Sequence, residues 1–381
     1  MPAILDKIKN SSRKTTTWRG KFSPVGLDLG SAMIKMVQLK KQRGIISVSN
    51  GFISRTPEGA FNNGELINPD LLARKIKAVF DQDSWQGSSI NISLNPQAFY
   101  YRTVRMPRLE KEALRKAMYW EALQNFPLNE GEVVFDYCLL DTSTGNDNKP
   151  MEYILAAAMS KTANLYTRLS DQAGLNCCAL EIEPLSLFRS FKSAQAGSVC
   201  CGTNNSLDKM QRNKPNILIH IGFHNTTLLI TGTNKLFFYR NIKIGTNKFI
   251  RAVQENQDCS ARNAEKYIFN HQASAGNDLE KALLDPGKQL TLKIEQGINL
   301  WLDQFGQADP GLHNLQFCGG GAFIPGLATA IARHLQLRHA LYNPLIKIGD
   351  DSTNSENKAY RNREKLFFPV AHGLALRGWE I

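Results

Sequence analysis

The sequence predicts an α/β protein of two related lobes with a small α+β insert. A strand–turn–strand pattern at Val25 to Leu39 recurs at Asn216 to Ile230, and the repetition of one supersecondary unit is typical of a duplicated lobe. Between the two copies, residues 95–179 mix strands with helices rich in charged and aromatic residues, which favours a compact α+β unit. With 381 residues, 42% of them hydrophobic, the chain is long enough for two or more cores.

Local composition predicts where these parts begin and end. The first 24 residues are basic and read as a flexible leader, while Ser193 to Pro215 is rich in Ser, Gly and Asn and reads as an exposed linker. We therefore expect the following parts: a leader at 1–24, a first lobe at 25–94 plus 180–192, the insert at 95–179, the linker at 193–215, and a second lobe at 216–381 with a helical subdomain at 251–311.

The periodicity of apolar residues predicts the individual elements. In the first lobe we expect a strand at 44–54, a helix at 68–80 and a strand at 90–94. In the insert we expect strands at 98–104, 132–140 and 153–159, with helices at 111–125 and 161–173. In the second lobe we expect helices at 248–255, at 261–270 with Ser260 as its cap, at 289–305, at 327–337 and at 369–376.

Charge and cysteine content narrow the class of protein. A formal net charge of +12 favours an acidic partner, but no nucleic-acid motif is visible and most cations read as solvated surface. The seven cysteines form an odd set without a Cys-x-x-Cys pair, which predicts free thiols in a reducing compartment. No apolar run approaches the ~20 residues that span a bilayer. We expect a cytosolic protein that does not bind nucleic acid.

The first hairpin has the residue order that a phosphate-binding turn requires. Gly30 lacks a Cβ, so backbone N–H groups beside Ser31 could approach a phosphate closely. Asp28 would hold a water bound to Mg²⁺, and Lys35 on the return strand would supply a compensating positive charge. A plain buried hairpin with a Gly-Ser turn would have the same pattern, so both interpretations stay open.

A second feature of this kind is the strand that ends in Gly319, Gly320 and Gly321. Three glycines would let a flat ligand lie against bare backbone, and the following helix start offers unpaired N–H groups. The alternative is an ordinary strand-to-helix turn.

Taken in order, the two hairpins and the glycine turn resemble the two phosphate motifs and the adenosine motif of the actin-like ATPase superfamily. Within it, the chain resembles the PilM family of type IV pilus assembly proteins, relatives of the cell-division protein FtsA. This narrower resemblance covers roughly residues 24–378 and rests on these segments: Met106-Pro107, Phe126 to Glu130, Val134 to Tyr137, Glu181 to Leu185, Pro325 to Leu327, Asn343 to Leu345 and Ala371 to Arg377.

The resemblance implies an actin-like two-lobed ATPase fold with an FtsA-type α+β insert, and ATP or ADP, with Mg²⁺, bound between the lobes. It also implies binding of the short N-terminal cytoplasmic tail of the inner-membrane protein PilN, recruitment to the inner face of that membrane, and links to other pilus and motor components. The implied nucleotide contacts are Asp28, Gly30, Ser31 and Lys35 for phosphate, His220 and Gly222 on the second hairpin, Gly319, Gly320 and Gly321 for the nucleoside, and Glu265 and Lys266 as further candidates for ribose or adenine.

One residue departs from the superfamily pattern. The second hairpin usually begins Asp-x-Gly, and here His220 takes the place of the acid. Imidazole replaces a carboxylate oxygen poorly around Mg²⁺, so we expect weak or absent hydrolysis and an adaptor rather than a turnover enzyme. A zinc site at His220 and His224 is disfavoured because no third ligand is evident.

Two other functions share the fold. A sugar or acetate kinase would need a catalytic carboxylate beside a substrate hydroxyl, for which no stretch is a candidate, and a filament-forming actin homologue rests on fold analogy alone.

The insert also predicts a binding surface. It contains Tyr100, Tyr101, Tyr119, Trp120 and Phe126, and aromatic side chains are enriched at binding hot spots. We expect most of these aromatic side chains to lie in the core of the insert. We expect the partner to bind in a groove between the insert and the first lobe.

Overall fold

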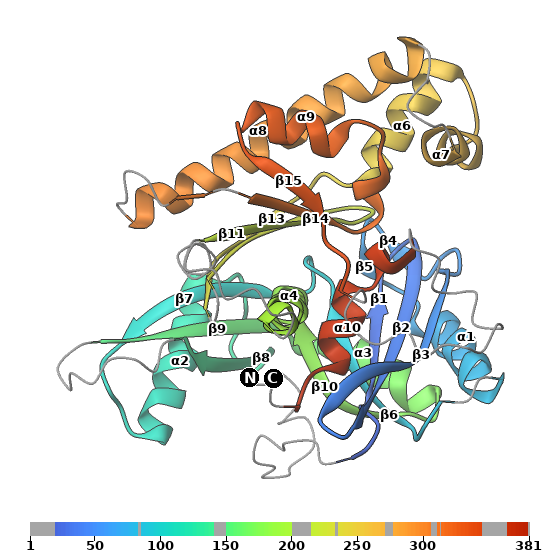
Figure 1. The fold of residues 1–381 in the computed structure, drawn as a ribbon. Coiled ribbons are helices and arrows are strands. Elements are labelled where there is room, and N and C mark those ends of the chain that lie inside the picture. Colours follow the sequence, from blue (N-terminus) through green and yellow to red (C-terminus); the bar gives the residue numbers. More distant parts are fainter. Residues whose placement is uncertain are drawn as a thin grey trace. The chain divides into compact units, whose positions relative to one another are not determined.

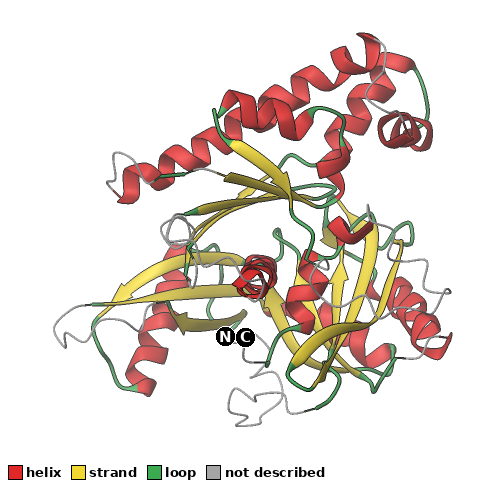
Figure 2. Ribbon diagram, viewed as in Figure 1, coloured by secondary structure: helices red, strands yellow, loops and turns green. Residues whose placement is uncertain are grey.

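The computed structural model describes residues 20–82, 85–140, 150–199, 215–232, 235–270, 277–305, 311–312, 314–344 and 364–379. The described residues up to Ser190 and from Val370 onward form one unit, and those from Phe191 to Pro369 form a second. Each unit contains a five-stranded sheet with helices packed on it (Figures 1 and 2). Among the described helices, none is long and apolar enough to cross a membrane.

The sheet of the first unit has the strand order β10-β6-β1-β2-β3. β1 pairs antiparallel with β2, which pairs antiparallel with β3, while β6 and β10 run parallel to β1. The strands are β1 (Val25–Leu29), β2 (Met33–Gln42), β3 (Ile45–Arg55), β6 (Ser89–Leu94) and β10 (Asn176–Ile182), with a small hairpin of β4 (Phe61–Asn62) and β5 (Glu65–Leu66) beside them.

The sheet of the second unit repeats this topology. Its order is β13-β12-β11-β14-β15, with β11 antiparallel to β12, β12 antiparallel to β13, and β14 and β15 parallel to β11. Its strands are β11 (Asn216–Ile221), β12 (Thr226–Thr231), β13 (Leu236–Ile242), β14 (Asn314–Cys318) and β15 (Arg338–Leu341). The internal repeat predicted from the two hairpins is therefore confirmed at the level of strand order and direction.

Helices cover both faces of the first sheet. α1 (Pro69–Gln82) begins with proline followed by Asp70, a favourable helix start, and packs on α3 (Ser160–Gln172). α4 (Glu183–Val199), as far as Ser190, and α10 (Pro369–Ala375), from Val370, complete the unit. Figure 1 shows α10 on the side of the sheet opposite α1.

The closing helix α10 was expected in the second lobe, and this assignment is wrong. Val370 and the residues after it belong to the first unit. The side-chain amide of Asn91 on β6 donates to the carbonyl of Leu374 at 2.9 Å, so α10 is fixed to the first sheet.

Two other expected boundaries also shift. The leader was expected to reach residue 24, yet Ser23 N donates to Leu39 O at 2.8 Å, so the chain pairs with β2 before β1 begins. The linker was expected from Ser193, yet α4 continues to Val199 because Ala and Gln favour a helix. Residues 1–19 of the leader and 200–214 of the linker lie outside the described residues.

The insert is a three-stranded antiparallel sheet of order β7-β9-β8 with one helix on it. Its elements are β7 (Tyr100–Met106), α2 (Lys111–Asn125), β8 (Val133–Leu139) and β9 (Met151–Met159). Leu114, Met118 and Ala122 lie at helical spacing on α2 and pack against Phe135 and Leu155 of the sheet. Because α3 packs on α1 and β10 lies in the first sheet, the insert's own core ends at β9, before the expected residue 179.

Helices of the second unit pack on one face of its sheet, as Figure 1 shows. They are α6 (Thr246–Gln257), α7 (Ala261–Asn270), α8 (Asn277–Phe305) and α9 (Leu327–His334). Ser260 caps α7 as expected, since its hydroxyl oxygen accepts from the backbone N–H of Asn263 at 3.3 Å. α8 begins before the expected residue 289 and continues through Pro286.

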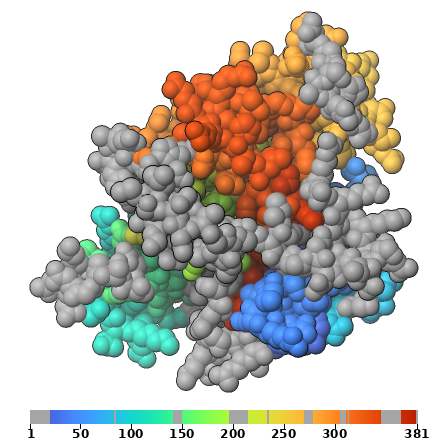
Figure 3. All heavy atoms as spheres, viewed as in Figure 1, coloured from blue at the N-terminus to red at the C-terminus, as the bar shows by residue number. Residues whose placement is uncertain are grey.

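The far end of the β2–β3 hairpin, drawn in blue, lies at the surface on the face seen in Figure 3. Ile45 there is 67% exposed. The buried residues of β3 are Ser47, Asn50 and Gly51, in its first half and middle, while Val48 is only partly buried.

Candidate functional site

The first hairpin brings Asp28 and Lys35 together. They are directly opposite each other in the β1–β2 register, and Lys35 Nζ lies 2.6 Å from Asp28 Oδ2 with both side chains at most 10% exposed. A Cβ on Gly30 would lie 2.8 Å from the carbonyl oxygen of Met33 and 3.0 Å from Lys35 Nζ. The turn is therefore tight, and a lysine ammonium lies directly beside its backbone.

Lys35 already has a partner, Asp28, and this contact limits how Lys35 can interact with a phosphate. A buried cation and carboxylate in contact neutralise each other, so the hairpin carries no net charge from this pair. A phosphate approaching Gly30 and Ser31 would meet Lys35 only if the ammonium is shared with Asp28. Asp28 in turn is held by Lys35, so a magnesium-bound water at Asp28 stays a prediction.

The second hairpin and the glycine turn lie together in the second unit. His220 on β11 is opposite Cys318 on β14, one residue before Gly319, because the two parallel strands end at the same edge of the sheet. Gly222 closes the hairpin, its N–H donating to the carbonyl of Asn225 at 2.8 Å and its own carbonyl accepting from Thr246 N at 2.9 Å. Ligands of parallel α/β sheets bind at this carboxyl edge.

The chain itself fills the space beside the three glycines. Gly319 has φ +82°, and a Cβ on it would lie 2.6 Å from Cδ2 of His220. A Cβ on Gly321 would lie 2.0 Å from Cγ2 of Ile221, and one on Gly320 would lie 3.2 Å from Phe367. Packing alone thus explains glycine at positions 319 and 321, and a role of the three glycines in contacting a nucleoside stays a prediction.

Glu265 and Lys266 are less directly placed. Both lie on α7, which packs on α6, and it is the first residue of α6, Thr246, that contacts the glycine turn, 3.2 Å from a Cβ on Gly321. One helix therefore separates α7 from the turn, and contacts of Glu265 and Lys266 with ribose or adenine stay a prediction.

A histidine zinc site has no support in the described part of the chain. His224 packs edge-on against Phe223, and its Nδ1 is 3.0 Å from the side-chain amide of Asn247. Burial, and to a lesser degree the charge of Arg251, lowers the pKa of His224. Among the described residues there is no group of three His, Cys, Asp or Glu side chains that could hold a metal ion.

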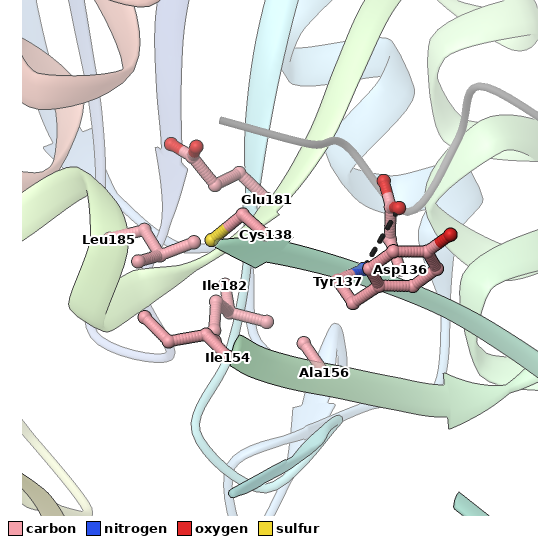
Figure 4. A pocket seen from close by; sticks show the side chains of 8 residues that line it. All are labelled: Asp136, Tyr137, Cys138, Ile154, Ala156, Glu181, Ile182 and Leu185. Atoms are coloured by element: carbon pink, nitrogen blue, oxygen red, sulfur yellow. Dashed lines mark hydrogen bonds between the residues drawn. The ribbon is translucent and has the colours of Figure 1, made fainter. Parts of the chain in front are cut away.

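A small pocket lies where the insert meets the first sheet (Figure 4). Its walls come from β8 and β9 of the insert and from the junction of β10 with α4. Cys138, Ile154, Ile182 and Leu185 gather around it, and Ala156 lies further along β9 in the figure. The residues that line it are Asp136, Tyr137, Cys138, Ile154, Ala156, Glu181, Ile182 and Leu185.

The pocket lies in the predicted region but not among the predicted side chains. Tyr100 stacks on Phe126 with ring centroids 5.4 Å apart, and Tyr119 contacts Phe135 at 5.7 Å, so these rings complete the insert's core. Trp120 is 53% exposed. Sequence reasoning did not assign the lining residues to a site, because periodicity does not distinguish a pocket wall from a core. The segments Val134 to Tyr137 and Glu181 to Leu185, which carry the family resemblance, contain five of them.

Next to the pocket is a buried charge cluster, here called the Glu181 cluster: Glu181, Arg189 and Arg377. Arg189 donates to both carboxylate oxygens of Glu181, at 2.6 and 2.8 Å, and Arg377 donates to Oε1 at 2.5 Å. Burial by itself would raise the pKa of Glu181, but the two guanidinium charges and their hydrogen bonds outweigh it and lower that pKa. Glu181 is therefore a fully buried, ionised carboxylate.

Burial has the opposite consequence for Cys138. Its thiol lies within the pocket lining, and burial raises the pKa of Cys138 to about 11. The thiol is thus an apolar wall group at neutral pH rather than a nucleophile.

The buried side chain of His372 should make the stability of the fold sensitive to acid. His372 is 1% exposed, its Nδ1 is 2.9 Å from the hydroxyl of Ser190, and burial lowers the pKa of His372 from 6.5 to about 3. Between these two pH values the His372 imidazole is protonated in the unfolded chain but neutral in the folded chain. The free energy of unfolding should therefore fall as the pH is lowered from about 6.5 toward about 3.

Urea unfolding of His372→Gln between pH 7 and 5 should show a shallower loss of stability than the parent protein. His339→Gln, at an exposed position, is the matched control and should keep the parent's slope. An identical slope in His372→Gln and in the parent would contradict the assignment.

Comparison with protein families decides what this architecture is. Residues 26–379 match the family described as type IV pilus assembly protein PilM, which covers both hairpins, the insert and the glycine turn. The chain belongs to the PilM family. The predicted family is therefore confirmed, and a sugar-kinase or acetate-kinase function is not favoured.

Solved structures confirm the actin-like fold of this PilM-family chain. The PilM–PilN type IV pilus biogenesis complex matches with TM-score 0.79 and 20% identity, over 95% of this chain and 100% of that chain. The ethanolamine utilization protein EutJ from Carboxydothermus hydrogenoformans matches with TM-score 0.55 and 14% identity, over 95% and 92%. Comparison with curated protein sequences finds no significant match.

Proposed function

We propose that this PilM-family protein is an adaptor of type IV pilus biogenesis that binds the N-terminal cytoplasmic tail of PilN in the pocket beside the insert. The pocket between β8, β9 and the β10–α4 junction is the observation on which the proposal depends. Binding of PilN is a property of the solved complex that this chain resembles at 20% identity. The adaptor then acts at the cytoplasmic face of the inner membrane, where PilN recruits it, and links PilN to other pilus components.

The chemistry of the pocket suits a peptide anchor. Ile154, Ile182 and Leu185 give the pocket an aliphatic lining that is at most 5% exposed, so a peptide side chain enters only as these side chains move apart. A buried aliphatic side chain contributes about 1.5–3 kcal/mol. Asp136 lines the same pocket, and its Oδ1 accepts from Tyr137 N at 2.9 Å, which fixes the carboxylate at the pocket. An aliphatic side chain in the pocket with a cationic group near Asp136 is the expected mode of binding.

Filling the pocket should block the tail. Ala156 is 6% exposed and lines the pocket, so Ala156→Phe places a ring where the peptide anchor is expected. We expect calorimetric titration with the PilN tail peptide to show at least a tenfold loss of affinity. Ala113→Phe, on the exposed side of α2, makes the same change in the same subdomain and should bind normally. Equal binding by both variants would contradict the pocket assignment.

The adaptor also binds ATP or ADP through the first hairpin, and nucleotide serves as a structural ligand. The tight turn at Gly30 with Lys35 beside it supports phosphate binding. The histidine at position 220 supports weak or absent hydrolysis, since the second hairpin lacks the acid that orders a metal.

Lys35→Ala should weaken nucleotide binding by about 1–3 kcal/mol, because it removes a charge from a largely desolvated turn. Fluorescent ADP binding measures this. The variant also leaves Asp28 without its partner, so folding is checked by circular dichroism at the same temperature. Lys77→Ala, on the exposed face of α1, is the control and should bind as the parent does. If a folded Lys35→Ala protein binds ADP as tightly as the parent does, the hairpin is a structural turn and not a phosphate site.

A further inference from the structure

The far end of the β2–β3 hairpin, at the surface in Figure 3, gathers three exposed cations. Lys41 ends β2 and Arg43 lies in the turn, while Lys21 is held beside them because its backbone carbonyl accepts from Lys41 N at 2.8 Å. None of the three pairs with an acidic side chain of the described residues. This end of the hairpin therefore presents positive charge that the described chain does not neutralise.

The neighbouring sequence offers little to neutralise it either. Between residues 20 and 57 the only acid is Asp28, and that carboxylate is buried against Lys35. An anionic partner would thus meet these cations without displacing an acid of the hairpin.

The turn holds an arginine in a conformation that arginine rarely adopts. Gln42 and Ile45 are opposite each other in the β2–β3 register, so Arg43 and Gly44 form a two-residue turn. φ is +51° at Arg43 and +82° at Gly44, the pattern of a type I′ turn, in which asparagine is preferred at the first position. The left-handed conformation is strained for a residue with a Cβ, and strained backbone of this kind gathers at functional sites.

The same turn is open to solvent on its apolar side. A Cβ on Gly44 would have nothing within 4 Å, and Ile45 is 67% exposed, the most exposed of the large hydrophobic side chains in the described ranges. An aliphatic side chain that projects among cations is suited to the interface of an anionic membrane, where it enters the boundary between headgroups and acyl chains. Duplex nucleic acid also attracts cations, but its phosphate backbone offers no apolar layer to such a side chain.

We propose that the far end of the β2–β3 hairpin is a lipid-binding surface. Lys21, Lys41 and Arg43 contact anionic headgroups, and Ile45 enters the boundary with the acyl chains. This contact goes beyond the proposed function, because it needs no PilN. A chain already held at a membrane by a PilN tail would meet the lipid at a high effective concentration, so even a weak contact would be occupied there.

Co-sedimentation of the full chain with lipid vesicles, without PilN, tests the proposal. The parent protein should bind vesicles that contain phosphatidylglycerol and should not bind vesicles of phosphatidylcholine alone. Each basic side chain near an anionic surface contributes about fivefold to binding, so Lys41→Gln/Arg43→Gln should bind about 25-fold more weakly. The matched control is Arg74→Gln/Lys77→Gln, which removes two exposed cations of α1 and should stay within about twofold of the parent.

Two single variants separate lipid binding from a folding defect. Arg43→Asn relieves the strained turn, so it should unfold at a temperature at least as high as the parent does and still bind the vesicles about fivefold more weakly. Ile45→Ser keeps every charge and should also bind more weakly, because it removes the side chain that enters the membrane.

Three results would overturn the inference. The first is a parent protein that does not bind the anionic vesicles. The second is equal binding by Lys41→Gln/Arg43→Gln and its control, which would assign the binding to the lysines and arginines of residues 1–19, intact in both variants. The third is an unchanged affinity of Ile45→Ser, which would leave only an attraction between charges. Titration with the PilN tail peptide measures the adaptor function separately, so each of these results leaves that function standing.

Discussion

Replacing Glu181 with glutamine is expected to lower the free energy of unfolding by about 3–5 kcal/mol, the usual cost of removing one partner from a buried ion pair. Glutamine has nearly the same shape, so the loss comes from leaving Arg189 and Arg377, 11% and 13% exposed, without a counter-charge. Chemical denaturation at pH 7 measures it. Because the pKa of Glu181 is lowered, its contribution is fully present above about 4.5 and is lost as the pH falls through the folded-state pKa.

The control for Glu181 is Glu152→Gln, which breaks the pair with Arg105, a side chain 71% exposed. An exposed pair contributes about 0–1 kcal/mol, so this variant should be nearly as stable as the parent. Similar losses in the two variants would show that the Glu181 cluster is no more important to the fold than a surface pair.

Gly26→Ala is expected to be the most disruptive single-methyl change in the first unit. The added Cβ would lie 1.9 Å from the carbonyl oxygen of Ala371 and 2.7 Å from the backbone nitrogen of Ala375. Backbone cannot rotate away as a flexible side chain can, so we expect a loss of more than the ~1–3 kcal/mol typical of overpacking.

Thermal unfolding compares Gly26→Ala with Gly287→Ala on α8. At Gly287 a Cβ meets only Leu327 Cδ1 at 3.6 Å, an ordinary contact, and alanine is favoured over glycine in a helix by about 1 kcal/mol. Gly287→Ala should raise the melting temperature and Gly26→Ala should lower it sharply. A melting temperature unchanged by Gly26→Ala would contradict the packing of α10 on β1.

The repeat of the two hairpins was enough to predict the β1–β2 and β11–β12 strand pairs, because alternating apolar residues around a turn specify a strand pair locally. The outer strands β10, β13 and β15 were not predicted. The position of α10 was not predictable in this way. Its apolar residues fit a buried helix on either lobe. Contacts with residues distant in sequence select the first unit: Gly26 and Gly373 admit the backbone of another element, and Asn91 donates to Leu374. Glycines in strand and helix interiors were the available signal, but a sequence does not say which backbone approaches them.

The candidate sites show the same difference between contacts that are local in sequence and contacts that are distant in sequence. Asp28 and Lys35 are seven positions apart across a short turn, so their cross-strand contact follows from local spacing. Glu181 and Arg377 are distant in sequence, and no pattern joins them. A buried acid between two apolar residues, as in Leu180-Glu181-Ile182, does indicate that a cationic partner exists, because an unpaired buried charge is too costly.

A crystal structure of the full chain with the PilN tail peptide tests the adaptor function most directly. We predict an aliphatic side chain of the peptide between Ile154, Ile182 and Leu185, with the peptide backbone passing along β8 near Asp136. A peptide bound on another surface of the chain, with this pocket unchanged, would contradict the assignment.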